Sequence, residues 1–133
     1  MLSYSNFGGT NEPRAVKVRK ATAIVRKHRP DLEVDGEMQA DTAVSQEVRE
    51  ENFPFTLLKG DANVLIFPDV QSGNIAYKLL QRLAGATAIG PLLVGMNKPV
   101  NVLQTESDVM AIVNVAAITS LEAQDADFLK GWE

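Results

Sequence analysis

Residues 63–85 read NVLIFPDVQSGNIAYKLLQRLAG, an apolar run followed by a polar turn and then a periodic stretch. The run NVLIF predicts a strand that is covered on both faces, and Pro68 ends it. After the turn, Ser72 is the expected N-cap of a helix over 73–84, with Gly85 at its carboxyl end. The side chains expected to face inward follow helical spacing: Ile75, Leu79 and Leu83.

The same alternation of short apolar runs and periodic stretches continues along the chain. Helices are expected from Pro13 to Pro30, over 42–51 with Asp41 as its cap, over 73–84, and over 108–124 with Ser107 as its cap. Strands are expected over 1–5, 32–34, 63–67, 88–94 and 100–103. This order predicts an α/β fold of three α-β-α layers, in which a mainly parallel sheet has helices on both faces.

The composition excludes several classes of protein. The chain of 133 residues has a net charge of −4 and a pI near 5.0, which argues against a nucleic-acid binder. It has no cysteine, so disulfides, thiolate catalysis and cysteine metal sites are excluded. The most apolar stretch, 109–121, is too short to span a bilayer, and no signal peptide is visible. We therefore expect a cytoplasmic protein without a membrane partner.

Two acidic or glycine-rich loops and the first helix carry polar residues that could serve a ligand. The loop SNFGGTNEP (5–13) is either a phosphate cradle or, as we favour, a flexible connection, because the known phosphate-loop spacings are absent. In VDGEMQAD (34–41), the acids are candidates for Mg²⁺ ligands or, preferably, for groups that cap helices and bind backbone N–H groups. The cations of the first helix are expected to form mostly a solvated face, with contact to a phosphorylated ligand as the alternative: Lys17, Arg19, Lys20, Arg26, Lys27, His28 and Arg29.

A ligand crevice is also expected where strands turn into helices farther along the chain. Gly73 allows a close backbone approach and Asn74 can both donate and accept, while Gly90 and Pro91 stand beside the next strand. The final helix is apolar nearly all round, which predicts that another domain or subunit covers it. Because the first residues already form an expected strand, we expect the chain to be part of a longer protein.

Several stretches together are similar to a known family. LSYSNFGGTNEP, PDLEVDGEMQADTA, LKGDANVLIFPD, SGNIAYKLLQRLAGATAIGPLLVGMNKPV and IVNVAAIT resemble, in order, the carboxy-terminal half of the phosphate acetyltransferase/butyryltransferase family. VDGEMQAD and PVNVLQ look most similar to the phosphotransacetylase-like domain of bacterial NADP-dependent malic enzymes. The resemblance implies that 1–106 form the second α/β domain of a dimer with a coenzyme A cleft, that 107–124 form a helix packing on an absent first domain, and that 125–133 form a polar tail.

The resemblance also locates the residues of acyl transfer. Transferases of this family typically read PVNDLSRGCSVEDIVN where this chain reads PVNVLQTESDVMAIVN over 99–114. Their Arg binds the phosphate, their Asp is the proposed base for the coenzyme A thiol, and their Ser stabilises charge near the carbonyl. Those positions are occupied here by Thr105, Ala111 and Gln104, respectively. Thr lacks the cationic fork of Arg and Ala cannot accept a proton, so we expect no catalytic residues and little transfer.

The resemblance therefore implies a non-catalytic regulatory and oligomerisation domain that binds acetyl-CoA as an effector. NADP and a divalent metal would act in a malic-enzyme domain outside this chain, which itself needs no cofactor or metal. The residues expected to line the acetyl-CoA pocket are Ser5, Asn6, Gly73, Asn74, Lys78, Gly90 and Pro91. Two alternatives remain open: an active phosphate acetyltransferase, and a purely structural dimerisation module.

Overall fold

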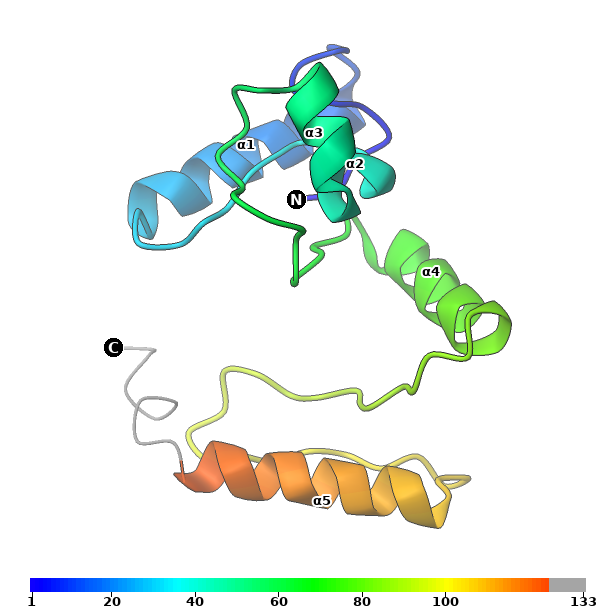
Figure 1. Cartoon of the computed structure of the whole chain (residues 1–133). Helices are drawn as coiled ribbons and strands as arrows, with labels where there is room; N and C mark the ends of the chain where they lie inside the picture. Colours follow the sequence, from blue (N-terminus) through cyan, green and yellow to red (C-terminus); the bar gives the residue numbers. More distant parts are fainter. Residues whose placement is uncertain (125–133) are drawn as a thin grey trace. The chain divides into compact units, whose positions relative to one another are not determined.

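The structure is a computed structural model that describes residues 1–124 (Figure 1). The chain divides into two compact units, Met1–Lys78 and Leu79–Glu133. Its helices are α1 (Pro13–His28), α2 (Ala40–Val44), α3 (Gln46–Asn52), α4 (Val70–Leu83) and α5 (Val109–Gln124). The predicted division at residue 106 stays a prediction, and the predicted polar tail, 125–133, lies outside the described residues.

Three extended segments meet at the centre of the first unit: the first contains Leu2, the second Met38 and the third Ile66. The Leu2 N–H donates to the carbonyl of Ile66 at 2.8 Å, and on the other side the Ser3 N–H donates to Met38 at 2.8 Å. Leu2 and Met38 form a parallel bridge. The segment order is therefore second, first, third, with the first predicted strand between the other two.

The predicted sheet stays a prediction, because the described residues contain only this short parallel pairing. Within residues 1–124 this pairing does not continue into a regular strand. Residues 88–94 and 100–103 likewise form no strand pairing with another segment. The strand predicted over 32–34 is wrong in position, because pairing occurs at Met38. Residues 34 and 35 instead bind Arg26, whose Nε donates to the Val34 carbonyl at 3.1 Å.

Helix α1 begins and ends near the predicted residues. Pro13 occupies its first turn, where a missing N–H costs nothing, and the helix ends at His28 before Pro30. Its buried face consists of Ala15, Val18 and Thr22.

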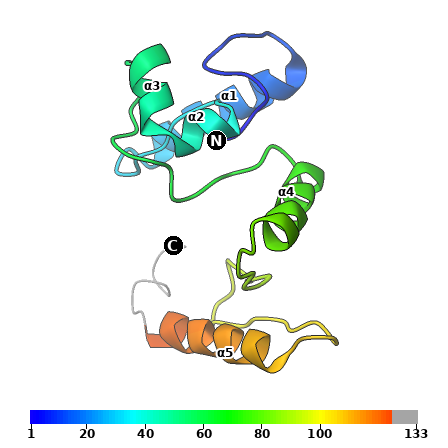
Figure 2. The same cartoon turned by 45° about the vertical axis from the view of Figure 1, so that its right-hand side comes forward.

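The single helix predicted over 42–51 is wrong, because the helical conformation is interrupted at Ser45, which separates α2 from α3 (Figures 1 and 2). Ser45 has extended φ and ψ of −134° and 108°, and its side chain accepts from the Val48 N–H at 3.3 Å as the N-cap of α3. Asp41 is not the cap, since α2 already begins at Ala40. The predicted buried residue Ala43 is buried, whereas Val44 is exposed.

Arg49, an unexpected core residue, binds α2 to the following loop. Its guanidinium donates to the carbonyls of Thr42 (2.6 Å), Ala43 (2.8 Å) and Gly60 (2.6 Å). These bonds satisfy carbonyls at the end of α2 that have no helical partner. Arg49 is only 1% exposed, so a charged side chain is buried where the helical pattern predicts an apolar buried face.

The acidic residues of VDGEMQAD bind the protein's own donors, which confirms the preferred interpretation of that stretch. Glu37, fully buried, accepts from the Gly8 N–H at 2.9 Å and from two nitrogens of Arg19 at 2.8 and 2.9 Å. Asp35 pairs with Arg26 and accepts from the N–H groups of Gly36 (2.8 Å) and Leu57 (2.7 Å). Arg19 and Arg26 therefore do not belong to the solvated face predicted for α1.

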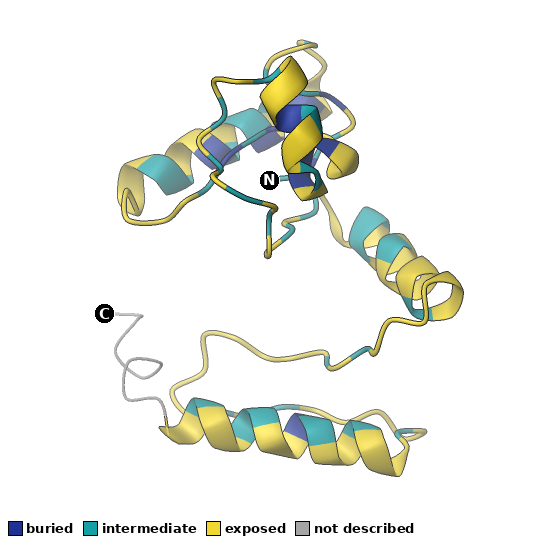
Figure 3. Cartoon of the chain, viewed as in Figure 1, coloured by how far each residue is buried: buried dark blue, intermediate teal, exposed yellow. Residues whose placement is uncertain are grey.

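The apolar faces of α4 and α5 are not covered by the described residues (Figure 3). No residue of α4 is buried, and the predicted inward side chains Ile75, Leu79 and Leu83 are 54%, 51% and 81% exposed. In α5 only Val115 is buried. Within residues 1–124, no helix combines the length and hydropathy that crossing a bilayer requires.

Gly36 provides a test of the junction between the first two segments. Its φ is +135°, and a Cβ there would lie 2.5 Å from the Met1 carbonyl oxygen. We predict that G36A lowers the free energy of unfolding by about 2–4 kcal/mol, through steric overlap and an unfavourable φ. G60A is the control, because a Cβ at Gly60 meets no atom within 4 Å. Equal denaturant midpoints for the two variants would contradict the close approach.

Glu37 predicts a dependence of stability on pH. Burial alone raises the pKa of Glu37, but the hydrogen bonds from Arg19 and Gly8 outweigh it, and the pKa is lowered overall. The ion pair therefore contributes fully above the unfolded pKa of about 4.3, and the contribution is lost as the pH falls through the lower folded pKa. We predict that E37Q costs about 1–3 kcal/mol at pH 7 and that its stability falls less steeply below pH ~5.

The matched control for this variant is E51Q, which removes an exposed carboxylate from α3. Its unfolding free energy should follow that of the unmodified protein from pH 7 to pH ~3. Parallel acid profiles for E37Q and E51Q in urea titrations would show that Glu37 is not the buried carboxylate that the structure describes.

Candidate ligand-binding site

The first unit contains a crevice where its extended segments end. The cavity has a volume of about 600 Å³, which lies within the range of small-molecule sites. Its walls come from the ends of the first and third segments and from the beginnings of α1, α2 and α4. In open parallel sheets this edge is where ligands bind. The lining residues are Leu2, Ser3, Tyr4, Pro13, Arg14, Lys17, Ala40, Phe67, Pro68, Asp69 and Ser72.

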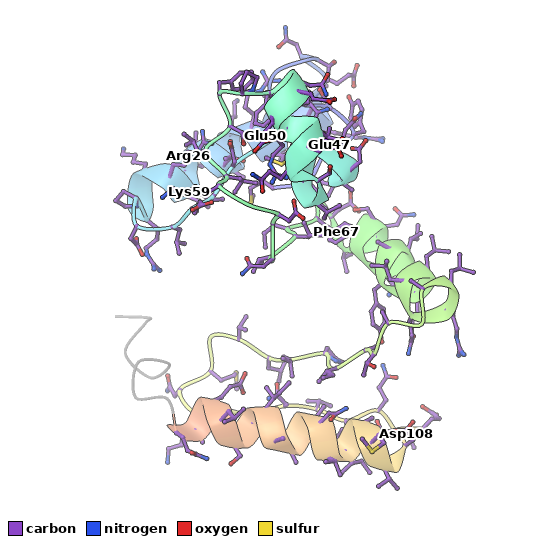
Figure 4. The ribbon with its side chains drawn as sticks, viewed as in Figure 1. Arg26, Glu47, Glu50, Lys59, Phe67 and Asp108 are labelled. Carbon is purple, nitrogen blue, oxygen red and sulfur yellow. The ribbon has the colours of Figure 1, made fainter. Side chains whose placement is uncertain are left out.

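Asp69 shapes the floor of this crevice by capping α4. Its Oδ1 accepts from the Ser72 N–H at 2.8 Å, and the Ser72 hydroxyl donates to the Asp69 carbonyl at 3.1 Å. The cap is therefore Asp69 and not Ser72, and α4 begins three residues earlier than predicted. The hydrogen bonds from Ser72 lower the pKa of Asp69, and the nearby Lys17 lowers it further. Figure 4 labels Phe67, which lies close to this end of α4.

Ser5 and Asn6, two predicted pocket residues, follow Tyr4 directly but are used within the protein. The Asn6 Oδ1 accepts from the Gln39 N–H at 2.7 Å, and its Nδ2 donates to Gln39 Oε1 at 3.2 Å. Ser5 is buried. Asn6 therefore joins the loop to the beginning of α2. The N–H groups of Gly8 and Gly9 bind Glu37 and the Asn6 carbonyl, which argues against a phosphate cradle in this loop.

Gly73, Asn74 and Lys78 follow the crevice along α4. Gly73 lies beside Phe67, since a Cβ built at Gly73 would be 3.5 Å from the Phe67 side chain, an ordinary van der Waals contact. Asn74 is exposed, and the Lys78 ammonium lies 4.8 Å from the ring centroid of Tyr77. None of these three lines the cavity itself, and their role in binding stays a prediction.

The second unit contains the turn that corresponds to the transfer site of the resembled family. The Ser107 N–H donates to the Gln104 carbonyl at 3.1 Å and closes a tight turn in which Gln104 and Thr105 are exposed. Asp108, labelled in Figure 4, accepts from the Ala111 N–H at 2.7 Å. Asp108 therefore caps α5 in place of the predicted Ser107. Ala111 lies in the first turn of the helix with only a methyl group.

Asn101 organises the segment that carries Gly90 and Pro91, the last two predicted pocket residues. Its Oδ1 accepts from the Leu93 N–H at 2.8 Å, while its Nδ2 donates to Thr119 at 2.9 Å and Glu122 at 3.1 Å. One amide thus joins two extended segments to α5. Gly90 has a φ of +124°, a conformation that favours glycine. The predicted pocket residues are divided between the two units.

Sequence reasoning missed Arg14, Asp69 and the role of Lys17 in this crevice. The Lys17 Nζ donates to the Pro68 carbonyl at 2.6 Å, across the junction between α1 and the third segment. A signal was present in Asp69-Val70-Gln71-Ser72, because an acid three residues before a helical N–H is a common cap. The pairing of Lys17 with Pro68 joins residues 51 positions apart, which spacing alone does not reveal.

We predict that N101A lowers the free energy of unfolding of the second unit by about 1–3 kcal/mol, since it leaves Leu93 and Thr119 without their amide partner. Hydrogen exchange at the Leu93 N–H should accelerate in this variant. N97A is the control, because Asn97 is exposed and its side chain makes no hydrogen bond within residues 1–124. Unchanged Leu93 exchange in N101A would contradict the arrangement.

Comparisons with known proteins identify the family of the chain. Residues 1–120 match the phosphate acetyl/butaryl transferase family. The chain is 48% identical over 124 residues to the phosphate acetyltransferase of Clostridium acetobutylicum. This alignment covers 93% of the chain and 37% of that relative. It is 40% identical over 124 residues to the NADP-dependent malic enzyme of Haemophilus influenzae, again over 93% of this chain but 16% of that relative.

One solved structure is similar to this chain. The EutD phosphotransacetylase from Staphylococcus aureus matches with a TM-score of 0.85 and 38% identity, over 92% of this chain and 38% of that one. The chain therefore belongs to the phosphate acetyl/butaryl transferase family, with a fold similar to the corresponding part of a phosphotransacetylase. It spans less than two-fifths of the length of the Clostridium relative.

Proposed function

We propose that this chain is a phosphotransacetylase-like domain that binds acetyl-CoA without transferring its acetyl group. The observation that carries the proposal is the turn before α5. Gln104 and Thr105 are exposed there, two acids follow them, and the turn from 104 to 108 has no cation. Transfer to phosphate needs positive charge where the anion binds. Here Glu106 would repel that anion.

The turn also lacks a base at the position where the resembled transferases have one. Ala111 cannot accept a proton from a thiol, and Asp108 Oδ1 accepts from the Ala111 N–H as the cap of α5. General-base assistance is typically worth about 10²–10⁴-fold, and one charge-stabilising donor about 10²–10³-fold. The absence of both supports binding without turnover.

We further propose that the domain belongs to an NADP-dependent malic enzyme. Such an enzyme oxidatively decarboxylates malate to pyruvate with NADP and a divalent metal held in another domain. The similarity to the Haemophilus influenzae enzyme and the sequence VDGEMQAD of residues 34–41 support this assignment. Acetyl-CoA would regulate it by binding one quaternary state of a homodimer or larger oligomer more tightly than another. The exposed apolar faces of α4 and α5 are suited to such assembly.

A second candidate is an active phosphate acetyltransferase. It is favoured by the higher identity to phosphate acetyltransferases, 48% to 49% in three cases against 40% for the malic enzyme. The two candidates differ in whether acetyl-CoA and phosphate yield acetyl phosphate and free coenzyme A.

Calorimetry of the full-length protein with acetyl-CoA tests the proposal. We expect saturable binding and an acetyl-CoA-dependent change in the rate of NADPH formation from malate. Absence of binding would favour a structural dimerisation module. Binding with no malate-dependent NADPH formation would refute the malic-enzyme parent.

Restoring the family's residues tests why transfer is absent. We predict that Q104S/T105R/A111D raises acetyl phosphate formation by at least about 10²-fold over the unmodified protein. The matched control Q104S/T105Q/A111D has a long side chain at 105 without the cation and should gain much less. An equal gain in both variants would mean that positive charge at position 105 is not what the turn lacks.

A further inference from the structure

Five cations in α1 and at its C-cap residue, Arg29, fall into two groups in the structure. Arg19, Arg26 and Arg29 each form an ion pair with an acid of the same unit: Glu37, Asp35 and Asp31, respectively. Arg14 and Lys17 instead line the crevice at the ends of the extended segments. They lie one turn apart, a spacing that places both side chains on one side of the helix.

Arg14 keeps its donors free for a ligand. Within residues 1–124 its guanidinium makes no hydrogen bond or ion pair, and the side chain is exposed. Lys17 donates to the Pro68 carbonyl, and an ammonium group has two further donors. Asp69 is the only acid of the lining, and its carboxylate accepts from the Ser72 N–H. The lining therefore contains two cations and one carboxylate, and that carboxylate is already hydrogen-bonded.

The remaining wall of the crevice is largely apolar. Leu2, Pro13, Phe67 and Pro68 contribute aliphatic and aromatic surface beside the two cations. Such a wall and a cationic edge suit a ligand that has a phosphate group at one end and an uncharged portion at the other. A coenzyme A thioester has this chemistry, with phosphates joined to an uncharged pantetheine arm.

We propose that Arg14 and Lys17 bind the phosphate groups of the ligand and that the apolar wall contacts its uncharged portion. The proposal rests on the proposed binding of acetyl-CoA and assigns residues to it. Arg binds phosphate through a planar fork of donors, whereas Lys provides a point charge. Arg14 is therefore the residue whose loss should weaken binding most, because Lys17 already donates to Pro68.

The experiment is a calorimetric titration of the full-length protein at low salt with three probes. These are acetyl-CoA, S-acetylpantetheine, which has no phosphate, and inorganic phosphate. R14Q and K17Q are compared with K20Q, which removes an exposed charge from the same helix outside the crevice. Thermal melting of each variant checks that the fold is intact, as expected for exposed side chains.

R14Q should weaken acetyl-CoA binding about tenfold and K17Q somewhat less, while S-acetylpantetheine binds all variants alike. K20Q should bind like the unmodified protein. If R14Q loses inorganic phosphate and keeps acetyl-CoA, the cations serve free phosphate and not the coenzyme. If R14Q and K17Q match K20Q with every probe, the assignment is overturned. If the unmodified protein binds phosphate through Arg14 but no acetyl-CoA, the proposed function fails and the anion site stands.

Discussion

The buried carboxylate of Glu37 is the interaction on which the first unit depends. It accepts from the backbone N–H of Gly8 and from two nitrogens along one edge of the Arg19 guanidinium, so one side chain joins a loop, a helix and the segment before α2. Met38, the next residue, pairs with Leu2, whose N–H in turn binds Ile66. A buried charge is costly unless it is paired and hydrogen-bonded, and here every part of that requirement is met by neighbouring residues. The crevice opens beside the segments that this arrangement holds together.

Sequence patterns predicted the helices well where local signals decide them. Pro13 and the spacing of Ala15 and Val18 located α1, and the parallel direction of the first segments followed from the alternation of elements. The break at Ser45 was not predictable, because it depends on Arg49 turning inward to carbonyls of α2 and of residue 60. The helix caps were misplaced for a different reason. Ser and Asp are both good caps, and only the geometry selects Asp69 and Asp108.

The extent of the sheet and the covering of the last two helices depend on contacts that periodicity cannot supply. A strand is defined by its partners, and 88–94 is apolar and extended without a ladder partner among residues 1–124. Similarly, an apolar helix such as α5 predicts a covering surface without identifying it. For the site, the sequence pattern predicted residues beside the crevice, such as Ser5, whose role in binding stays a prediction. It missed Arg14 because a lone arginine in a first helical turn carries no signal of its own.

The functional account depends on what the turn before α5 can and cannot do. In this turn the Ser107 N–H donates to the Gln104 carbonyl and Asp108 caps α5, within the residues 1–120 that match the family. Its side chains offer no cation for phosphate, and Ala111 stands where the resembled transferases have their proposed base. Phosphate-dependent loss of acetyl-CoA by the unmodified full-length protein is the most direct measurement of this claim, made beside an active phosphate acetyltransferase at equal concentration. The account predicts that acetyl-CoA binds and that acetyl phosphate does not accumulate, whereas turnover at a rate comparable to that of the active enzyme would contradict it.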